Sequence, residues 1–192
     1  MADKALSEAA QASLKKHAAD PVVLAAHDSA WADQFAGLAA QMKAVCADKF
    51  VTIHHIGSTS VPGLAAKPLI DMMPELRRHE DGPSLVPLLE PLGFLYFGAY
   101  GIEGRHFFRR KGDVDVNVHM FETGHIEIER HLVFRDALRS DPKLLAAYQG
   151  MKEELAARFP NDVDSYARSK SDFIEGVLRE LGAPERPAGP DS

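Results

Sequence analysis

The stretch HHIGSTSVPGLAAKPLIDMM, residues 54–73, constrains the fold most, because it sets two apolar segments around a loop that begins with Gly57 and Ser58. The β-branched residues before Gly57 predict one strand. Residues 67–73 predict a second strand, which Pro74 ends. A strand that runs into Gly-Ser can aim successive backbone N–H groups at an anion. The same pattern is also typical of a plain tight turn between two strands.

The segment DVDVNVHMF, residues 113–121, alternates strictly between polar and apolar side chains, which predicts a strand with two different faces. Its polar face carries Asp113, Asp115, Asn117 and His119. Asp71 lies near the end of the second apolar strand, so adjacent strands would place the Gly-Ser loop and a carboxylate at the same end of the sheet. A strand face that is merely exposed to solvent is the alternative for this segment.

The rest of the N-terminal two thirds predicts helices around a sheet. Aromatic runs broken by glycine between residues 93 and 124 indicate two or three antiparallel strands. The other expected elements are a helix or fraying tail at 4–18, an edge strand at 22–25, a helix that begins at Asp28 or Ser29, and a short helix at 84–92.

The C-terminal third has helical patterns. Helices are expected at about 126–139, from Asp141-Pro142 to about Phe159, and from Asn161 or Asp162 to about Leu181. Residues 183–192, APERPAGPDS, are expected to be a disordered tail. The predicted fold class is therefore α+β, with one domain over residues 1–182. Its mixed sheet is flanked by helices, and its helical part covers about residues 126–182.

Composition argues against several classes of protein. The net charge of −6 lacks the basic character of a nucleic-acid-binding surface, so nucleic acid is not an expected partner. A single cysteine rules out an intramolecular disulfide framework. No apolar run approaches the roughly 20 residues that cross a bilayer, and the N-terminus lacks the pattern of a signal peptide. A cytoplasmic protein without a membrane partner is expected, and the sequence predicts no oligomeric state.

Several motifs together resemble the GrpB-like family, whose fold is of the nucleotidyltransferase type. The resemblance is carried by HIGSTSVPGLAAKPLID and by VVLAAHDSAWADQF, GIEGRHFFRRKG, NVHMFETG, HLVFRDALRSDP and YARSKSDFIEGVL, which together span most of the chain. It implies a nucleotidyltransferase-like sheet in which the Gly-Ser loop holds the phosphates of a nucleotide.

Nucleotidyltransferases of this fold follow the Gly-Ser loop with Asp-x-Asp or Asp-x-Glu on the next strand, because two magnesium ions need oxygen ligands. Here Met73 stands where the second carboxylate is expected after Asp71, and a thioether is a poor magnesium ligand. The resemblance implies Asp71 and His119 as catalytic groups and metal ligands. Asp115 and His55 are expected as further ligands of a divalent metal (Mg, Mn or Zn).

The remaining candidate residues would contact phosphate. The expected set comprises the loop residues Gly57, Ser58, Thr59 and Ser60, the cations Lys67, Arg105 and Arg109, and Tyr166 with Lys170, four positions apart on the last predicted helix. Surface cations and a packing stripe along that helix are the alternatives. Neither Ser58 nor Ser60 is expected to be an acyl nucleophile, because no Gly-x-Ser-x-Gly motif is present and no base is assigned to them.

The sequence thus favours a metal-dependent nucleotidyltransferase that acts on a small-molecule acceptor. Two alternatives keep the same fold: a catalytically inactive module that binds a nucleotide or anion, and a helper in the assembly of a partner protein. The first two readings share one expected partner, which is a nucleotide or another phosphorylated or anionic small molecule.

Overall fold

A five-stranded mixed sheet organises the molecule. The computed structural model describes residues 6–18 and 20–187. The strands are β1 (Phe50–Ile56), β2 (Leu69–Leu76), β3 (Leu95–Tyr96), β4 (His106–Arg110) and β5 (Asp115–Glu122), in the order β1-β2-β5-β4-β3. Only the β2–β5 pair is parallel among them. The mixed sheet predicted from the sequence is therefore confirmed, as are three strands between residues 93 and 124.

Strand β2 does not end at Pro74, as the sequence predicted, but continues to Leu76. Its pairing with β1 includes Pro74, which lies opposite Ile53. The parallel pairing with β5 covers Met72 and resumes at Glu75, leaving out the positions between them. Because proline has no N–H to donate, the β-ladder is interrupted there while the strand itself continues.

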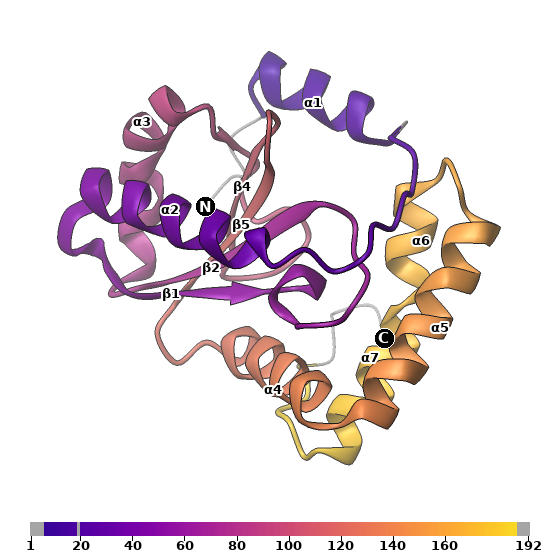
Figure 1. Ribbon diagram of the computed structural model, residues 1–192. Coiled ribbons are helices and arrows are strands. Elements are labelled where there is room, and N and C mark those ends of the chain that lie inside the picture. Colours follow the sequence, from indigo (N-terminus) through magenta and orange to yellow (C-terminus); the bar gives the residue numbers. More distant parts are fainter. Residues whose placement is uncertain (1–5, 19, 188–192) are drawn as a thin grey trace.

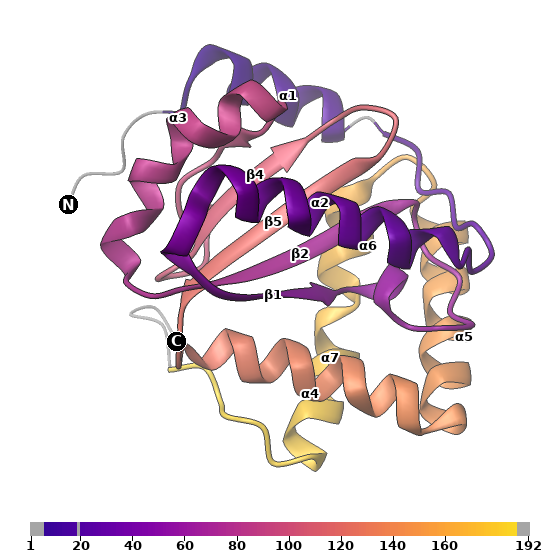
Figure 2. The same cartoon turned by 60° about the vertical axis from the view of Figure 1, so that its left-hand side comes forward.

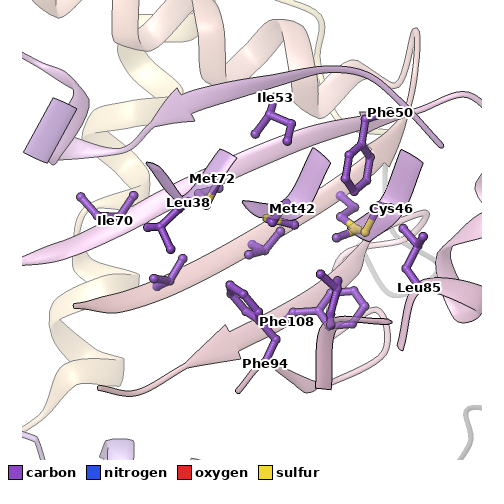
Figure 3. Packing of buried hydrophobic residues seen from close by; sticks show 14 of the residues in the cluster. Leu38, Met42, Cys46, Phe50, Ile53, Ile70, Met72, Leu85, Phe94 and Phe108 are labelled. Atoms are coloured by element: carbon purple, nitrogen blue, oxygen red, sulfur yellow. The ribbon is translucent and has the colours of Figure 1, made fainter. Parts of the chain in front are cut away.

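One face of the sheet is covered by α2 (Ala30–Cys46) and α3 (Val86–Leu89), and it holds the largest apolar cluster. Figure 3 shows side chains from the helices and the sheet meeting there, among them Leu38, Met42, Ile70, Met72 and Phe108. Burial of this much apolar area is the main stabilising contribution available to a domain of this size.

The other side of the sheet carries α4 (Ile126–Ser140), with α5 (Pro142–Arg158), α6 (Val163–Ser169) and α7 (Ser171–Glu180) beyond it (Figures 1 and 2). The start of α5 follows the sequence signal, because Asp141 accepts hydrogen bonds from the backbone N–H groups of Lys143 and Leu144. Helix α1 (Glu8–Ala18) confirms the helical alternative for that segment, and residues 4–5 lie outside the described part.

Several predicted elements differ. The single last helix is in fact α6 and α7, separated at Lys170, because Tyr166 packs beside Val22 whereas Ile174 packs beside Tyr148. The edge strand at 22–25 is reduced to one bridge between Ala25 and Ala66. Residues 79–92 form 3-10 turns around the four-residue α3, because prolines interrupt the helical hydrogen bonding.

Part of the segment expected to be disordered is packed. Ala183 is buried, the Pro184 carbonyl accepts a hydrogen bond from Arg130, and Arg186 pairs with Glu127. The prediction of a disordered tail is therefore wrong up to residue 187, and residues 188–192 lie outside the described part. None of the described helices has the length and apolar character needed to span a membrane.

Candidate functional site

The Gly-Ser loop is a tight 3-10 turn that is pressed against Asp71. Gly57 has a φ of 68°, and a Cβ placed on it would lie 2.3 Å from Asp71 Oδ2. A glycine is required here both by the left-handed backbone and by this close approach. The turn and the carboxylate predicted from two separate strands therefore lie in contact at one end of the sheet.

Only one hydroxyl of the loop borders the cavity described below. Ser58 lines it, whereas Thr59 and Ser60 are buried and use their hydroxyls on backbone carbonyls. Thr59 donates to the Leu69 carbonyl over 3.1 Å, and Ser60 donates to the Gly57 carbonyl over 2.6 Å. The hydroxyls of Thr59 and Ser60 therefore fix the turn, and the predicted contact of the 57–60 loop with phosphate stays a prediction.

Asp71 is held as a carboxylate by its neighbours on β5. Asn117 Nδ2 donates to Asp71 Oδ1 over 3.0 Å, and His119 Nε2 lies 3.6 Å from the same oxygen. Burial by itself favours the neutral acid, but the interactions with His119 and Asn117 outweigh it and keep the pKa of Asp71 below its usual value. Arg109 Nε donates to Asn117 Oδ1 over 3.1 Å, which extends the chain of hydrogen bonds to a cation.

The hydrogen-bonding pattern of His119 determines which nitrogen carries its proton. Arg105 Nη1 lies 3.2 Å from His119 Nδ1, and a guanidinium can only donate, so Nδ1 accepts. In the neutral ring the proton then resides on Nε2, the nitrogen that faces Asp71. Arg105 Nε and Nη2 donate to the carbonyls of Ala99 and Tyr100, so Arg105 supports the loop and His119. It does not line the cavity, and its predicted contact with phosphate stays a prediction.

The expected ligand set does not fit a divalent metal. His119 offers Asp71 a proton and no lone pair, and Asp115 is paired with Lys111, 3.1 Å away. Met73, at the position of the missing carboxylate, is fully buried in an apolar cluster with Ile128 of α4. Throughout the described residues, no group of three or more His, Cys, Asp or Glu side chains is placed to hold a metal ion.

His55 is also absent from this group, which corrects its prediction as a ligand. It pairs with Met72, on the face of β2 opposite to Asp71, and its ring stacks on Phe35 of α2 at 4.6 Å. Its Nε2 lies 3.1 Å from Thr59 Oγ1. Burial lowers its pKa to about 4, so the ring is neutral and serves as part of the core.

A cavity of about 280 Å³ opens between the Gly-Ser turn and the helices α4, α5 and α7. Its lining contains both charged and apolar side chains. The lining residues that bear charge or titrate are Asp71, His119, Glu127, Arg130, His131, Arg135, Lys170 and Arg186, and the apolar ones include Phe134, Leu138, Ile174 and Leu178. Four basic side chains and two carboxylates line the cavity, but Arg130 and Arg186 also pair with Glu175, and Arg135 pairs with Asp136. Lys170 is therefore the lining lysine or arginine without an ion pair among the described residues.

Lys170 is the predicted cation that reaches this cavity. Its pKa is lowered to about 8, mainly by burial, while Asp71 acts in the opposite direction. Its Nζ lies 4.5 Å above the ring of Tyr166, which packs in a separate cluster and does not line the cavity. Lys67 and Arg109 lie outside the lining, and Arg109 Nη1 is buried without a hydrogen-bond partner among the described residues.

Two residues near the site were not predicted from the sequence, Lys152 of α5 and His131 of α4. Lys152 is 2% exposed, and its Nζ donates to Ser58 Oγ over 3.0 Å and to the Ala65 carbonyl. Burial lowers its pKa to about 7. His131 donates from Nδ1 to the Glu127 carbonyl over 2.7 Å, which leaves Nε2 as the acceptor in the neutral ring. No local signal marks these residues, because helical spacing does not distinguish a buried lysine from an exposed one.

The fold and the turn beside Asp71 define the class of protein, which has a nucleotidyltransferase-like fold. The chain is similar to the Cid1 poly(U) polymerase solved with Mg 3′-dATP bound, with a TM-score of 0.54 and 12% identity over 82% of this chain and 51% of that one. At this identity the likeness concerns the fold.

The chain belongs to the GrpB family, because the family model described as "GrpB protein" matches residues 21–180. The UPF0157 protein BH1888 of Halalkalibacterium halodurans is 33% identical over 94% of this chain and 92% of its own length. The UPF0157 protein YqkA of Bacillus subtilis is 38% identical over 78% of this chain, which spans 44% of YqkA. The crystal structure of GrpB from Enterococcus faecalis matches with a TM-score of 0.77 and 34% identity, over 82% of this chain and 96% of that one.

Proposed function

We propose that the cavity beside the Gly-Ser turn binds a phosphorylated or otherwise anionic small molecule, with a nucleotide as the first candidate. The observation that carries the proposal is Lys170, a partly buried cation that lines the cavity and makes no ion pair among the described residues. Lys170, Arg130 and Arg135 line the cavity together with Ser58. Cations that are partly removed from water bind anions more strongly than exposed ones.

The apolar residues that line the cavity favour a ligand with an uncharged part. Phe134, Leu138 and Ile174 line the same cavity as the charged residues, so a nucleoside or another flat apolar group could be buried against them. Two of the arginines that line the cavity already form ion pairs within the protein. Arg130 and Arg186 pair with Glu127 and Glu175. Lys170, which has no comparable carboxylate within ion-pair distance among the described residues, is therefore the primary anion contact.

The test is a thermal-shift and calorimetric titration with inorganic phosphate, nucleoside monophosphates and nucleoside triphosphates, each with EDTA and with magnesium. A bound ligand raises the melting temperature in a concentration-dependent way. The Lys170→Met variant is expected to weaken binding about 10-fold or more, since a hydrogen bond to a charged group contributes about 1.5–3 kcal/mol. Lys143→Met removes the same charge at an exposed site on α5 and serves as the control. Equal affinity of the two variants would refute the proposal.

Nucleotidyl transfer to a small acceptor is the second candidate, and the contact between Gly57 and Asp71 favours it. The described side chains around Asp71 do not fit a divalent metal. The discriminating assay measures pyrophosphate release from nucleoside triphosphates in the presence of pooled hydroxyl and amine acceptors. Release that is lost in Asp71→Asn, with binding retained, would favour transfer. Binding without release would favour the binding module.

A further inference from the structure

Ser58, which lines the cavity, is in contact with Lys152, a buried residue of α5 that does not itself line it. Lys152 Nζ lies 3.0 Å from Ser58 Oγ, and its other partner is the Ala65 carbonyl. No described carboxylate lies within hydrogen-bond distance of this ammonium, which is 2% exposed. Ser58 itself lines the cavity. A buried lysine beside an accessible hydroxyl is the arrangement that general-base activation of serine requires.

The surroundings of Lys152 favour the neutral amine. A buried ammonium that lacks a carboxylate partner is costly, and burial lowers the pKa of Lys152 to about 7, with Lys170 acting in the same direction. When the amine is neutral, one N–H can remain on the Ala65 carbonyl while the lone pair accepts the proton of Ser58. The hydroxyl of Tyr148 also interacts with Ser58.

We propose that Ser58 is a nucleophile with Lys152 as its base, and that the cavity accepts a carboxylic ester that bears a negative charge. Ser58 Oγ forms a bond to the ester carbonyl carbon, and its proton passes to Lys152 Nζ. The bond to the alcohol oxygen breaks, and Lys152 returns that proton to the departing alcohol. Water then attacks the acyl-Ser58, with Lys152 taking its proton, and releases a carboxylic acid as Ser58 Oγ regains a proton.

This inference goes beyond anion binding and uses the proposed anion site only for the charge of the substrate. Lys170 faces the same cavity as Ser58 and would hold the negative group of the ester. The nucleophile itself can be tested with a neutral reagent that needs no anion site. Failure of one proposal is therefore distinguishable from failure of the other.

The first experiment treats the full chain with a neutral alkyl fluorophosphonate, whose fluoride leaves when serine oxygen attacks phosphorus. Intact-mass spectrometry and peptide mapping are expected to show one adduct, located on Ser58, with a rate that rises as the pH passes through about 7. Ser58→Ala abolishes the adduct. Lys152→Met slows its formation by at least about 100-fold, the usual contribution of a general base. Ser140→Ala, an exposed change at the end of α4, leaves the rate unchanged.

The Lys152→Met variant keeps an apolar chain of similar length in a buried site, so it is expected to fold, and its thermal unfolding is measured in parallel. A wild-type chain that forms no adduct, or an adduct rate in Lys152→Met within threefold of wild type, overturns the proposal. The second experiment compares hydrolysis of 4-nitrophenyl succinate with that of uncharged 4-nitrophenyl acetate. Lys170→Met is expected to reduce the first rate selectively. Loss of that selectivity with labelling retained would refute the charged substrate and leave the nucleophile.

Discussion

The two faces of the sheet differ sharply although the same strands supply both. On the α2 side, Ile70 and Met72 of β2 join Val116 and Val118 of β5 in a fully buried apolar cluster. Between Ile70 and Met72, Asp71 faces the α4 side of the sheet, where it contacts Asn117 and His119. Strict alternation thus lets a rigid apolar layer fix the positions of a polar network. The geometry of the polar network therefore depends on the apolar packing on the other face of the sheet.

Met73 is an exception to this difference between the faces, because it is an apolar residue on the α4 side of the sheet. It is fully buried with Ile56, Phe121 and Ile128 beneath α4. The position that carries a second carboxylate in nucleotidyltransferases is therefore covered by a helix as well as chemically changed. A carboxylate at position 73 could reach a metal beside Asp71 only if this cluster opened.

The largest expected effect comes from reversing that change. Met73→Asp should destabilise the protein by about 4 kcal/mol, because it places an unpaired carboxylate in an apolar cluster. Met73→Leu, which keeps the volume, should cost less than about 1.5 kcal/mol. Urea unfolding monitored by circular dichroism measures both. A mild effect of Met73→Asp would mean that the α4 side tolerates charge at this position and that the two faces differ less than the burial indicates.

Gly57→Ala should be the next largest, at about 3 kcal/mol. The new Cβ would lie 2.3 Å from Asp71 Oδ2 in addition to the cost of a φ of 68°. Gly63→Ala is the matched control, because Gly63 has a φ of 81° but no atom within 4 Å of the added carbon, and about 1–2 kcal/mol is expected. The difference between the two variants in chemical unfolding isolates the contact with Asp71. Equal losses would show that Asp71 can move away.

The pH dependence of stability should reveal the charge of Lys152. Above pH 7 the unfolded chain still binds a proton on this lysine that the folded chain has released, so the free energy of unfolding rises with pH. From pH 7 to pH 9 the rise attributable to Lys152 is about 2 kcal/mol. Unfolding of wild type and Lys152→Met over this range measures it. Parallel curves would indicate an ordinary lysine.

The smallest effect is expected at Asp115, on the polar strand but outside the network. Its ion pair with Lys111 is partly exposed, so Asp115→Asn should change stability by less than about 0.5 kcal/mol and leave anion binding unchanged. Asp71→Asn, measured beside it, removes the carboxylate that accepts from Asn117. Similar effects of the two substitutions on binding would extend the site along β5 toward Asp115.

The sequence predicted what depends on local patterns. Alternation over 113–121 gave the face shared by Asn117 and His119, and the cap at Asp141 gave the start of α5. The errors lie where distant parts of the chain decide. Pro74 continues in a strand because β1 still pairs with it, and the last helix divides because its halves pack in different clusters.

Most helices and strands, the Gly-Ser turn and the loss of a second carboxylate at Met73 could be predicted from the amino-acid sequence, because periodicity and residue chemistry are local properties. Only the tertiary structure decided that His55 faces the core, that Arg105 fixes His119, and that Lys152 reaches Ser58 from 94 positions away. These contacts arise from how helices pack on a sheet. The same packing removes water from Lys152 and places its amine beside Ser58, which lines the cavity.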